Sequence, residues 1–258
     1  MATALITGAS SGLGLEFAKL HARDGHSLIL VARRKDMLEE IAGRLRTENP
    51  KIRVDVIDLD LGAPGAGQGL FDRVNQMGRT VDYLVNNAGF GSNGEFAKQP
   101  LAKEIQMIDL NIRTLVEATH LFLGPMVARG SGKILNIGST AGFQPGPFMA
   151  TYYATKAFVN SFSEALHEEL RGTGVTCTVL APGATATEFA QSANSSSSRL
   201  FNTGLVANSR DVARIGYRAM LAGRPLAVAG LVNRWMVQAL RVTPRFVVRR
   251  MVAAMNQG

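Results

Sequence analysis

Residues 4–14 read ALITGASSGLG, a short apolar run that leads directly into a glycine-rich turn. An amphipathic helical pattern over residues 13–24 follows at once. Glycines at such a strand-to-helix turn let the chain bend tightly and let backbone N–H groups approach a pyrophosphate at the helix N-terminus. The stretch therefore predicts a dinucleotide-binding turn at the start of an α/β domain.

Outward from this turn, apolar runs rich in Val, Ile and Leu alternate with helical patterns along the chain. Regular alternation with nearly continuous apolar strands is typical of a parallel sheet covered by helices on both faces. We therefore predict a doubly wound Rossmann fold with a parallel seven-stranded sheet, in a single domain over residues 1–258. The predicted strands are 4–7, 27–31, 53–57, 83–85, 133–137, 175–180 and 226–229, and the predicted helices are 13–24, 35–47, 70–77, 101–129 (broken at Pro125) and 151–171.

Composition excludes several classes of protein. The chain has 258 residues, of which 46% are hydrophobic and 19% charged, and this balance excludes a disordered chain. A single cysteine, Cys177, excludes an intramolecular disulfide, and no histidine–carboxylate spacing resembles a metal site, so no metal is expected. No export signal is visible, and glycines and prolines interrupt the longest uncharged stretch, residues 134–155. These features predict a cytoplasmic protein.

Two other motifs compete for the glycine turn. Residues 8–12 match the G-x-S-x-G turn of hydrolases, whose acid and histidine partners follow later in the chain. No histidine here lies in an obvious loop after a strand, and that motif leaves Gly14 unexplained. The phosphate-binding motif G-x-x-x-x-G-K-[ST] does not occur. The dinucleotide interpretation is therefore favoured.

The spacing Thr-Gly-x-x-x-Gly-x-Gly over residues 7–14 resembles that of the classical short-chain dehydrogenase/reductase family. Further motifs of that family occur in the family's order and cover the chain to residue 187. They are Asn86-Asn87-Ala88-Gly89, Asn111, Ser139, Tyr152-x-x-x-Lys156, and Pro182-Gly183 with Thr187. The resemblance implies an NAD(P)-dependent oxidoreductase that interconverts a ketone and a secondary alcohol.

Tyr152 and Lys156 lie four residues apart at the start of a predicted helix, so they project from one face. A neighbouring ammonium and a helix N-terminus favour tyrosinate, which predicts a Tyr152 pKa below its ordinary value of about 10. Such a group can exchange a proton with the substrate oxygen during hydride transfer. By resemblance, Lys156 also binds the nicotinamide ribose, Ser139 bonds the developing alkoxide and Asn111 holds a relay water. The spacing gives Tyr153 no cationic partner, so we expect it to point away.

The end of the second strand indicates which cofactor is bound. Arg33 and Arg34 follow it, and no carboxylate occurs before Asp36. An acidic residue here suits the ribose hydroxyls of NAD, whereas arginine suits the 2′-phosphate of NADP, so NADP(H) is predicted. One departure is Ser11, at the position where some NADP-binding relatives carry a basic residue. The residues predicted to bind the cofactor are Gly8, Ser10, Ser11, Gly12, Leu13, Gly14, Arg33, Arg34, Asp58, Leu59, Asn87, Ala88, Gly89, Tyr152, Lys156, Pro182, Gly183, Thr185 and Thr187.

Two segments are predicted to enclose the substrate. Residues 184–208 follow the sixth strand and read as a lid, with Leu200, Phe201, Leu205 and Val206 as apolar contacts. The facing wall is predicted from residues 142–149, through Phe143, Pro145, Pro147, Phe148 and Met149. Apolar walls favour a hydrophobic carbonyl or alcohol. Resemblance to bacterial reductases, and more distantly to hydroxysteroid and 3-oxoacyl reductases, leaves aliphatic, steroid-like and 3-oxoacyl substrates open.

The net charge of +8 lies in the C-terminal part of the chain, because no acidic residue follows Asp211 while eight arginines do. Residues 231–258 form a basic amphipathic extension, with Thr243-Pro244 predicted to begin its second helix. The pattern favours packing over the pocket or a subunit interface. The alternatives are that this extension binds a membrane surface or that it attracts an anionic substrate. The two apolar stripes are Val232, Trp235, Met236, Ala239 and Leu240, then Val247, Val248, Met251, Val252 and Met255.

Two further expectations concern partners. The predicted helix 151–171 carries small and aromatic residues suited to close packing, and resemblance to the family implies a homodimer or homotetramer formed through it. The basic tail lacks a groove-reading motif, so no nucleic-acid partner is expected. A non-catalytic NADP-binding sensor or interaction protein on the same fold stays open as an alternative, although an intact Ser139, Tyr152 and Lys156 argue against it.

Overall fold

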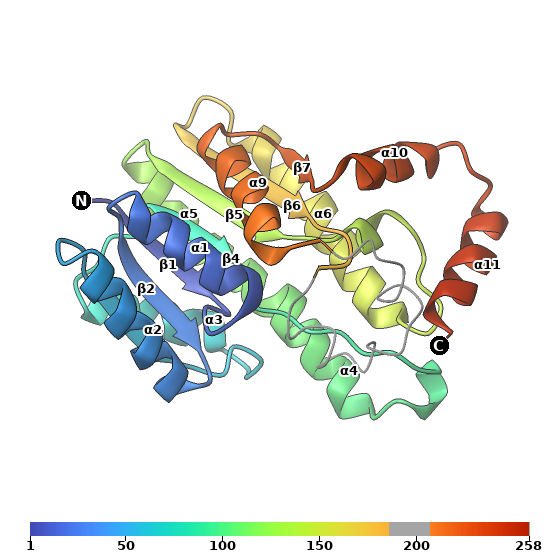
Figure 1. Ribbon diagram of the computed structural model, residues 1–258, viewed down its shortest axis with the longest axis horizontal. Helices are drawn as coiled ribbons and strands as arrows, with labels where there is room; N and C mark the ends of the chain where they lie inside the picture. Colours follow the sequence, from blue (N-terminus) through green and yellow to red (C-terminus); the bar gives the residue numbers. More distant parts are fainter. Residues whose placement is uncertain (186–206, 258) are drawn as a thin grey trace.

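The computed structural model describes residues 1–185 and 207–257. Its centre is a seven-stranded sheet in the order β3-β2-β1-β4-β5-β6-β7, in which every neighbouring pair is parallel (Figure 1). This confirms the doubly wound fold predicted from the alternating pattern. The strands are β1 (Thr3–Thr7), β2 (Ser27–Ala32), β3 (Val54–Asp58), β4 (Tyr83–Asn86), β5 (Gly132–Ile137), β6 (Val175–Ala181) and β7 (Leu226–Val228).

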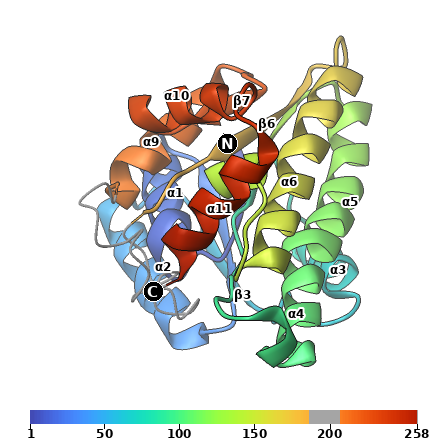
Figure 2. The ribbon, with the colours of Figure 1, turned by 90° about the vertical axis from the view of Figure 1, so that its right-hand side faces the viewer.

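Helices cover both faces of the sheet (Figure 2). One apolar layer lies between the sheet and α1 (Gly12–Arg23), α2 (Lys35–Glu48) and α9 (Ser209–Leu221). A second layer lies between the opposite face and α3 (Ala66–Gln76), α5 (Thr114–Ala128) and α6 (Ala150–Glu169). Because both faces are covered, the central strands are apolar on successive residues. In β1, all five residues are buried.

The strand order reverses between β1 and β4, and this switch point opens a crevice at the carboxyl ends of the strands. Chain segments after β1, β2, β4, β5 and β6 all reach this edge of the sheet. The short helices η1 (Phe96–Lys98) and η3 (Thr140–Phe143) follow β4 and β5 there. The fold therefore gathers residues distant in sequence at one edge.

The predicted helix over residues 101–129 is divided at a different place from the one expected. It consists of α4 (Leu101–Ile108), a π-helical segment η2 (Asp109–Arg113) and α5. The predicted break at Pro125 is wrong, since α5 continues past this proline to Ala128. Only one turn follows Pro125, so its missing N–H removes a single hydrogen bond near the helix end.

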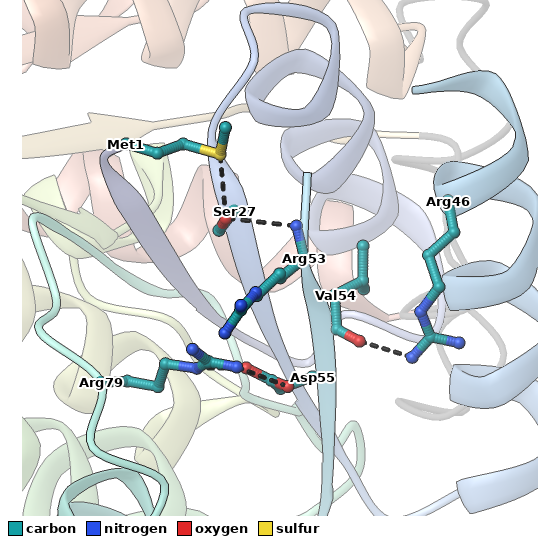
Figure 3. A network of polar contacts seen from close by, with 7 residues as sticks. All are labelled: Met1, Ser27, Arg46, Arg53, Val54, Asp55 and Arg79. Atoms are coloured by element: carbon teal, nitrogen blue, oxygen red, sulfur yellow. Dashed lines mark hydrogen bonds and ion pairs between the residues drawn. The ribbon is translucent and has the colours of Figure 1, made fainter. Parts of the chain in front are cut away.

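Polar contacts hold edge strand β3 at its amino end (Figure 3). Ser27 Oγ accepts a hydrogen bond from Arg53 N at 3.2 Å and contacts the Met1 sulfur at 3.3 Å. Arg79 donates two bonds to the Asp55 carboxylate, at 2.7 and 3.2 Å. This bidentate pair raises the pKa of the Arg79 guanidinium. These contacts lie at the end of the sheet opposite the crevice, so they serve the fold.

Two helices after β7 form the C-terminal extension, α10 (Leu231–Ala239) and α11 (Arg245–Asn256), and α11 lies beside the carboxyl edge of the sheet (Figures 1 and 2). The predicted cap at Thr243 is wrong: α11 begins after Pro244, and Thr243 Oγ1 donates to the Ala239 carbonyl at 2.8 Å. Since that hydroxyl is already bonded to α10, it is turned away from the N-terminus of α11. No helix in residues 1–185 and 207–257 has the length and apolar character needed to cross a bilayer.

The two predicted apolar stripes of this extension differ in burial. In α11, Val248 and Val252 are buried, as packing requires. In α10 the buried side chain is Val237, whereas Trp235 is 76% exposed. The predicted stripe on α10 is therefore not its buried face, since Val232, Trp235 and Ala239 are exposed and Val237 lies outside the stripe.

Phe17 offers a test of this packing. Its side chain is fully buried between α1 and α9, where a Cβ on Gly216 would lie 3.3 Å from its ring. Phe17→Ala should lower the free energy of unfolding by about 3–5 kcal/mol in a urea titration. Phe96→Ala removes a 63% exposed ring and should change it by no more than about 0.5 kcal/mol. Equal losses in the two variants would contradict the described core.

Candidate active site

The glycine turn after β1 has no room for side chains. Gly8 and Gly12 adopt φ values of +66° and +53°, in the left-handed region that favours glycine. A Cβ on Gly14 would lie 2.2 Å from the Gly8 carbonyl oxygen, so α1 approaches the turn closely. Ser11, the N-cap of α1, makes no side-chain capping bond. The first-turn N–H groups of α1 are therefore not capped by that side chain.

Hydrogen bonds lock this turn to the end of β4. Thr7 Oγ1 accepts bonds from the backbone N–H groups of Asn87 and Ala88, at 2.9 and 3.0 Å. Asn87 Nδ2 donates to the carbonyls of Thr7 and Gly8, at 2.9 and 3.2 Å. The Thr-Gly and Asn-Ala-Gly motifs thus form one structural unit across the switch point.

A cavity of about 820 Å³ runs along the carboxyl ends of the strands. Glycine-turn residues, Arg33 and Arg34 line it together with Ser139, Tyr152 and Lys156. Among the described residues, three predicted site residues are not in its lining: Gly14, Asp58 and Asn111. The lining includes the other predicted residues Gly8, Ser10, Ser11, Gly12, Leu13, Leu59, Asn87, Ala88, Gly89, Pro182, Gly183 and Thr185.

Tyr152 and Lys156 project together from the first turns of α6 and are both buried. Lys156 Nζ lies 5.9 Å from the centre of the Tyr152 ring, at the limit of a cation–π contact. The same ammonium donates a 2.7 Å hydrogen bond to the carbonyl oxygen of Ile137, the last residue of β5. The strand end therefore fixes where the cation sits.

Burial controls the proton affinities of the pair. Desolvation raises the pKa of Tyr152 and outweighs its hydrogen bond to Ser139, which acts in the opposite direction. This reverses the predicted lowering of the Tyr152 pKa. Burial also lowers the pKa of Lys156 to about 8. Removal from water disfavours the charged form of each group, and for Tyr152 this cost outweighs the lowering expected from the neighbouring ammonium.

Ser139 lies two residues beyond β5 and caps η3. Its Oγ accepts a bond from Ala141 N at 3.1 Å and faces the Pro182 carbonyl at 3.4 Å. Asn160 of α6 donates to the Ser139 carbonyl at 3.0 Å. The serine hydroxyl is therefore held between β5, β6 and α6, on the side where it bonds Tyr152.

Asn111 lies in the π-helical segment η2 and is buried. Its side chain accepts from Phe90 N at 3.2 Å and donates to Phe90 O at 3.0 Å and to Thr155 Oγ1 at 3.1 Å. A Cβ on Gly89 would lie 2.9 Å from Asn111 Oδ1 and 3.7 Å from Lys156 Nζ. In this structure Asn111 holds the loop after β4 against α6, and its relay-water role stays a prediction.

The remaining predicted residues outside the cavity lining have separate explanations. Gly14 faces the Gly8 carbonyl inside the turn. The Asp58 carboxylate lies 3.8 Å from Arg73, and its predicted contact with the cofactor stays a prediction. Thr187 and most of the predicted lid 184–208, including Leu200, Phe201, Leu205 and Val206, lie outside the described residues.

Tyr153 does not point away from the site, so that prediction is wrong. Its ring lines the cavity and meets the Tyr152 ring edge-on, with centres 6.1 Å apart. Asn256 of α11 donates to the Pro147 carbonyl at 2.9 Å and faces Tyr153 Oη at 3.5 Å. The prediction considered only the neighbours of Tyr153 within its own helix, four residues along the chain. In the structure α11 folds back against Tyr153 and encloses its side chain.

The substrate wall also differs from the prediction. Of the apolar residues named in segment 142–149, Met149 lines the cavity, while Phe143, Pro145, Pro147 and Phe148 are not among its lining. Residues of the C-terminal helices line the cavity as well. Their apolar stripes had favoured packing over the pocket or a subunit interface. The residues from these helices are Val232, Asn233, Met236, Met251, Val252, Met255 and Asn256.

The residues present fit a dinucleotide that carries a 2′-phosphate. The glycine turn presents backbone at a helix N-terminus, a geometry that suits a pyrophosphate. Arg33 and Arg34 are exposed between β2 and α2 and line the same end of the cavity. Arg34 Nη2 donates to Ser10 Oγ at 3.1 Å, which ties the arginine to the turn.

Comparisons with known proteins indicate the family to which the chain belongs. A family model described as short chain dehydrogenase matches residues 2–198. The chain is 42% identical to sulfoacetaldehyde reductase 2 of Chromohalobacter salexigens, over 72% of this chain and 73% of that protein. It is 36% identical to the very-long-chain 3-oxoacyl-CoA reductase of Anas platyrhynchos, over 74% of this chain but only 62% of the relative's length.

A solved short-chain dehydrogenase from Sphingobium yanoikuyae, in complex with NADPH, superimposes with a TM-score of 0.83 at 32% identity. That match covers 95% of this chain and 97% of the other. The chain belongs to the short-chain dehydrogenase family. It is therefore an oxidoreductase acting on C=O and CH–OH groups, which confirms the class of protein expected from the sequence motifs.

Replacement of Lys156 by an uncharged residue tests whether burial lowers the pKa of this lysine. Because the pKa of Lys156 is about 8 against an ordinary 10.5, the folded protein binds fewer protons than the unfolded chain between these pH values. The buried lysine thus destabilises the fold at neutral pH, and this effect fades as the pH rises toward 10.5. Without cofactor, Lys156→Met should be more stable than the parent at neutral pH, with the difference shrinking across that window in urea titrations.

The matched control is Lys19→Met, which removes an ammonium whose side chain is 50% exposed. This variant should show no such pH dependence. A Lys156→Met protein that is less stable than the parent at every pH would contradict the assigned desolvation.

Proposed function

We propose that the protein interconverts a hydrophobic ketone and its secondary alcohol with NADP(H). The observation that supports the proposal is that one cavity contains both a predicted cofactor site and a predicted catalytic site. One has a glycine turn with two arginines, and the other has Tyr152, Lys156 and Ser139. The solved relative from Sphingobium yanoikuyae is an NADPH complex, which supports the same cofactor here.

Reduction follows from the protonation states of the chain's own groups. The nicotinamide, when bound, supplies the hydride that the carbonyl carbon accepts. Tyr152 is protonated at neutral pH because burial raises its pKa, so its hydroxyl can donate a proton to the carbonyl oxygen. Ser139 offers a second hydroxyl toward that oxygen as negative charge develops. Lys156, held by the Ile137 carbonyl, stabilises the tyrosinate left behind.

The proposed substrate is apolar. The part of the cavity wall built by α10 and α11 contains three methionines, two valines and two asparagines, and no charged side chain. Methionine is flexible and polarisable, so such a wall adapts to differing hydrophobic shapes. The relative named sulfoacetaldehyde reductase implies a substrate with a sulfonate; the α10 and α11 part of the wall provides no cation for it, although Lys103 lines the cavity elsewhere. A long aliphatic, steroid-like or 3-oxoacyl ketone fits it better.

Tyr152→Phe tests the proton donor. Loss of the hydroxyl should lower turnover of a hydrophobic ketone at least about 100-fold, because a general acid contributes on that scale. NADPH binding, followed by fluorescence titration, should persist. Tyr153→Phe is the neighbouring control and should have a mild effect on turnover. Undiminished turnover in Tyr152→Phe would refute the assignment, and a parent that binds NADPH but reduces no ketone would favour a sensor.

Joint replacement of Arg33 and Arg34 by glutamine tests the cofactor preference. Only NADPH carries the 2′-phosphate that arginines bind, so the KM for NADPH should rise far more than that for NADH. Steady-state kinetics with both cofactors measures the ratio. Arg44→Gln with Arg46→Gln, in the same helix region but outside the cavity lining, should leave the ratio unchanged. Equal losses for the two cofactors would show that Arg33 and Arg34 support only the fold.

The assembly is proposed to be a homodimer or homotetramer formed through α6. One exposed stripe on this helix consists of Ala154, Phe158, Ser161 and Ala165, at helical spacing. Small residues beside an exposed aromatic ring suit close helix packing. Light scattering should give a multiple of the 27.6 kDa chain mass, and Phe158→Glu should lower it. A monomeric parent, or a Phe96→Glu control that dissociates equally, would contradict this interface.

A further inference from the structure

The two C-terminal helices leave several large apolar side chains in solvent. We define the C-terminal surface as the exposed residues of α10, α11 and the turn between them. Trp235 is 76% exposed, Val242 84% and Phe246 56%. Leu231 lies one helical turn before Trp235 and is 72% exposed. Packing within residues 1–185 and 207–257 does not account for these side chains, because the helices bury other residues, Val237, Val248 and Val252.

The same surface is strongly basic. Arg234, Arg241, Arg245, Arg249 and Arg250 are all exposed. Within residues 207–257, none of these five forms an ion pair; the one pair there joins Arg214 to Asp211. No acidic residue follows Asp211 in the sequence, so nothing in the extension neutralises this charge.

The charge distribution indicates which partner can cover this surface. A second copy of the same surface would bring like charges together. The rest of the chain offers no compensating excess, because the eight arginines after Asp211 account for the entire net charge of +8. A partner that is both apolar and anionic complements this surface best. Helices that carry Trp, Phe and Leu beside arginines are typical of segments that lie in the interface of an anionic bilayer.

We propose that the C-terminal surface binds the surface of an anionic phospholipid bilayer. Trp235, Val242 and Phe246 enter the headgroup region, and the neighbouring arginines meet lipid phosphates. Both helices also line the cavity, through Met236 on α10 and Met251 on α11. Docking thus places part of the cavity wall beside the lipid, from which a hydrophobic substrate can enter. This last consequence rests on the proposed function, whereas the binding itself does not.

Trp235 makes the test direct, since it is the sole tryptophan of the chain. The intact protein is mixed with phosphatidylcholine vesicles, with or without phosphatidylglycerol. Only the anionic vesicles should shift the Trp235 emission to shorter wavelength and carry the protein into the pellet on centrifugation. Added salt should reverse both effects. No turnover is measured, so the outcome is independent of the proposed reaction.

Paired variants locate the binding surface. Arg245→Gln with Arg249→Gln should weaken vesicle binding about thirtyfold, given the usual contribution of each arginine near an anionic surface. Arg23→Gln with Arg171→Gln removes the same charge from exposed sites on other elements and should weaken it far less. Trp235→Ser should lower pelleting, whereas Phe96→Ser should not. Retained NADPH binding and melting temperature establish that each variant is folded.

Three outcomes would overturn the proposal. The first is the absence of any spectral shift or pelleting with anionic vesicles at low ionic strength. The second is equal binding to neutral vesicles, or equal losses in the paired and control variants. The third is a Trp235→Ser protein that binds vesicles normally but has a lower mass by light scattering, which would assign this surface to an interface between copies of the chain.

Discussion

The site depends on one buried charge, the Lys156 ammonium. This group donates a hydrogen bond to the Ile137 carbonyl oxygen and lies beside the Tyr152 ring. The end of β5 must deliver the Ile137 carbonyl, and α6 must begin just before Tyr152. Gly142 must lack a side chain, because a Cβ there would lie 2.5 Å from the Lys156 backbone oxygen. The sheet edge and the helix start are therefore arranged around one desolvated cation.

The sequence predicted the parts of the molecule that follow from local patterns. Strand–helix alternation gave the parallel sheet, and the four-residue spacing of Tyr152 and Lys156 placed both on one face of α6. Contacts between distant segments were not predictable in this way. The direction of the Tyr152 pKa shift depends on burial by several elements, and Tyr153 is turned into the site because α11 folds over it. The π-helical placement of Asn111 has no signal in periodicity either.

The two ends of the cavity are built by different means. At the cofactor end, backbone geometry leaves little freedom, as the close approach of Gly8 and Gly14 shows. The substrate end is walled by flexible side chains such as Met251 and Met255, from helices at the end of the chain. This difference explains why motifs identify the family and the reaction class, whereas the substrate is proposed only as a chemical class.

Direct titration of Tyr152 shows whether burial keeps this hydroxyl protonated despite the adjacent lysine. Tyrosinate absorbance would be followed against pH in the protein without cofactor, and the titration of Tyr152→Phe would be subtracted. If desolvation governs the pair, the Tyr152 signal emerges only above the ordinary tyrosine pKa of about 10. A tyrosinate signal near neutral pH would contradict it and would show that the Lys156 charge, not desolvation, governs the pair.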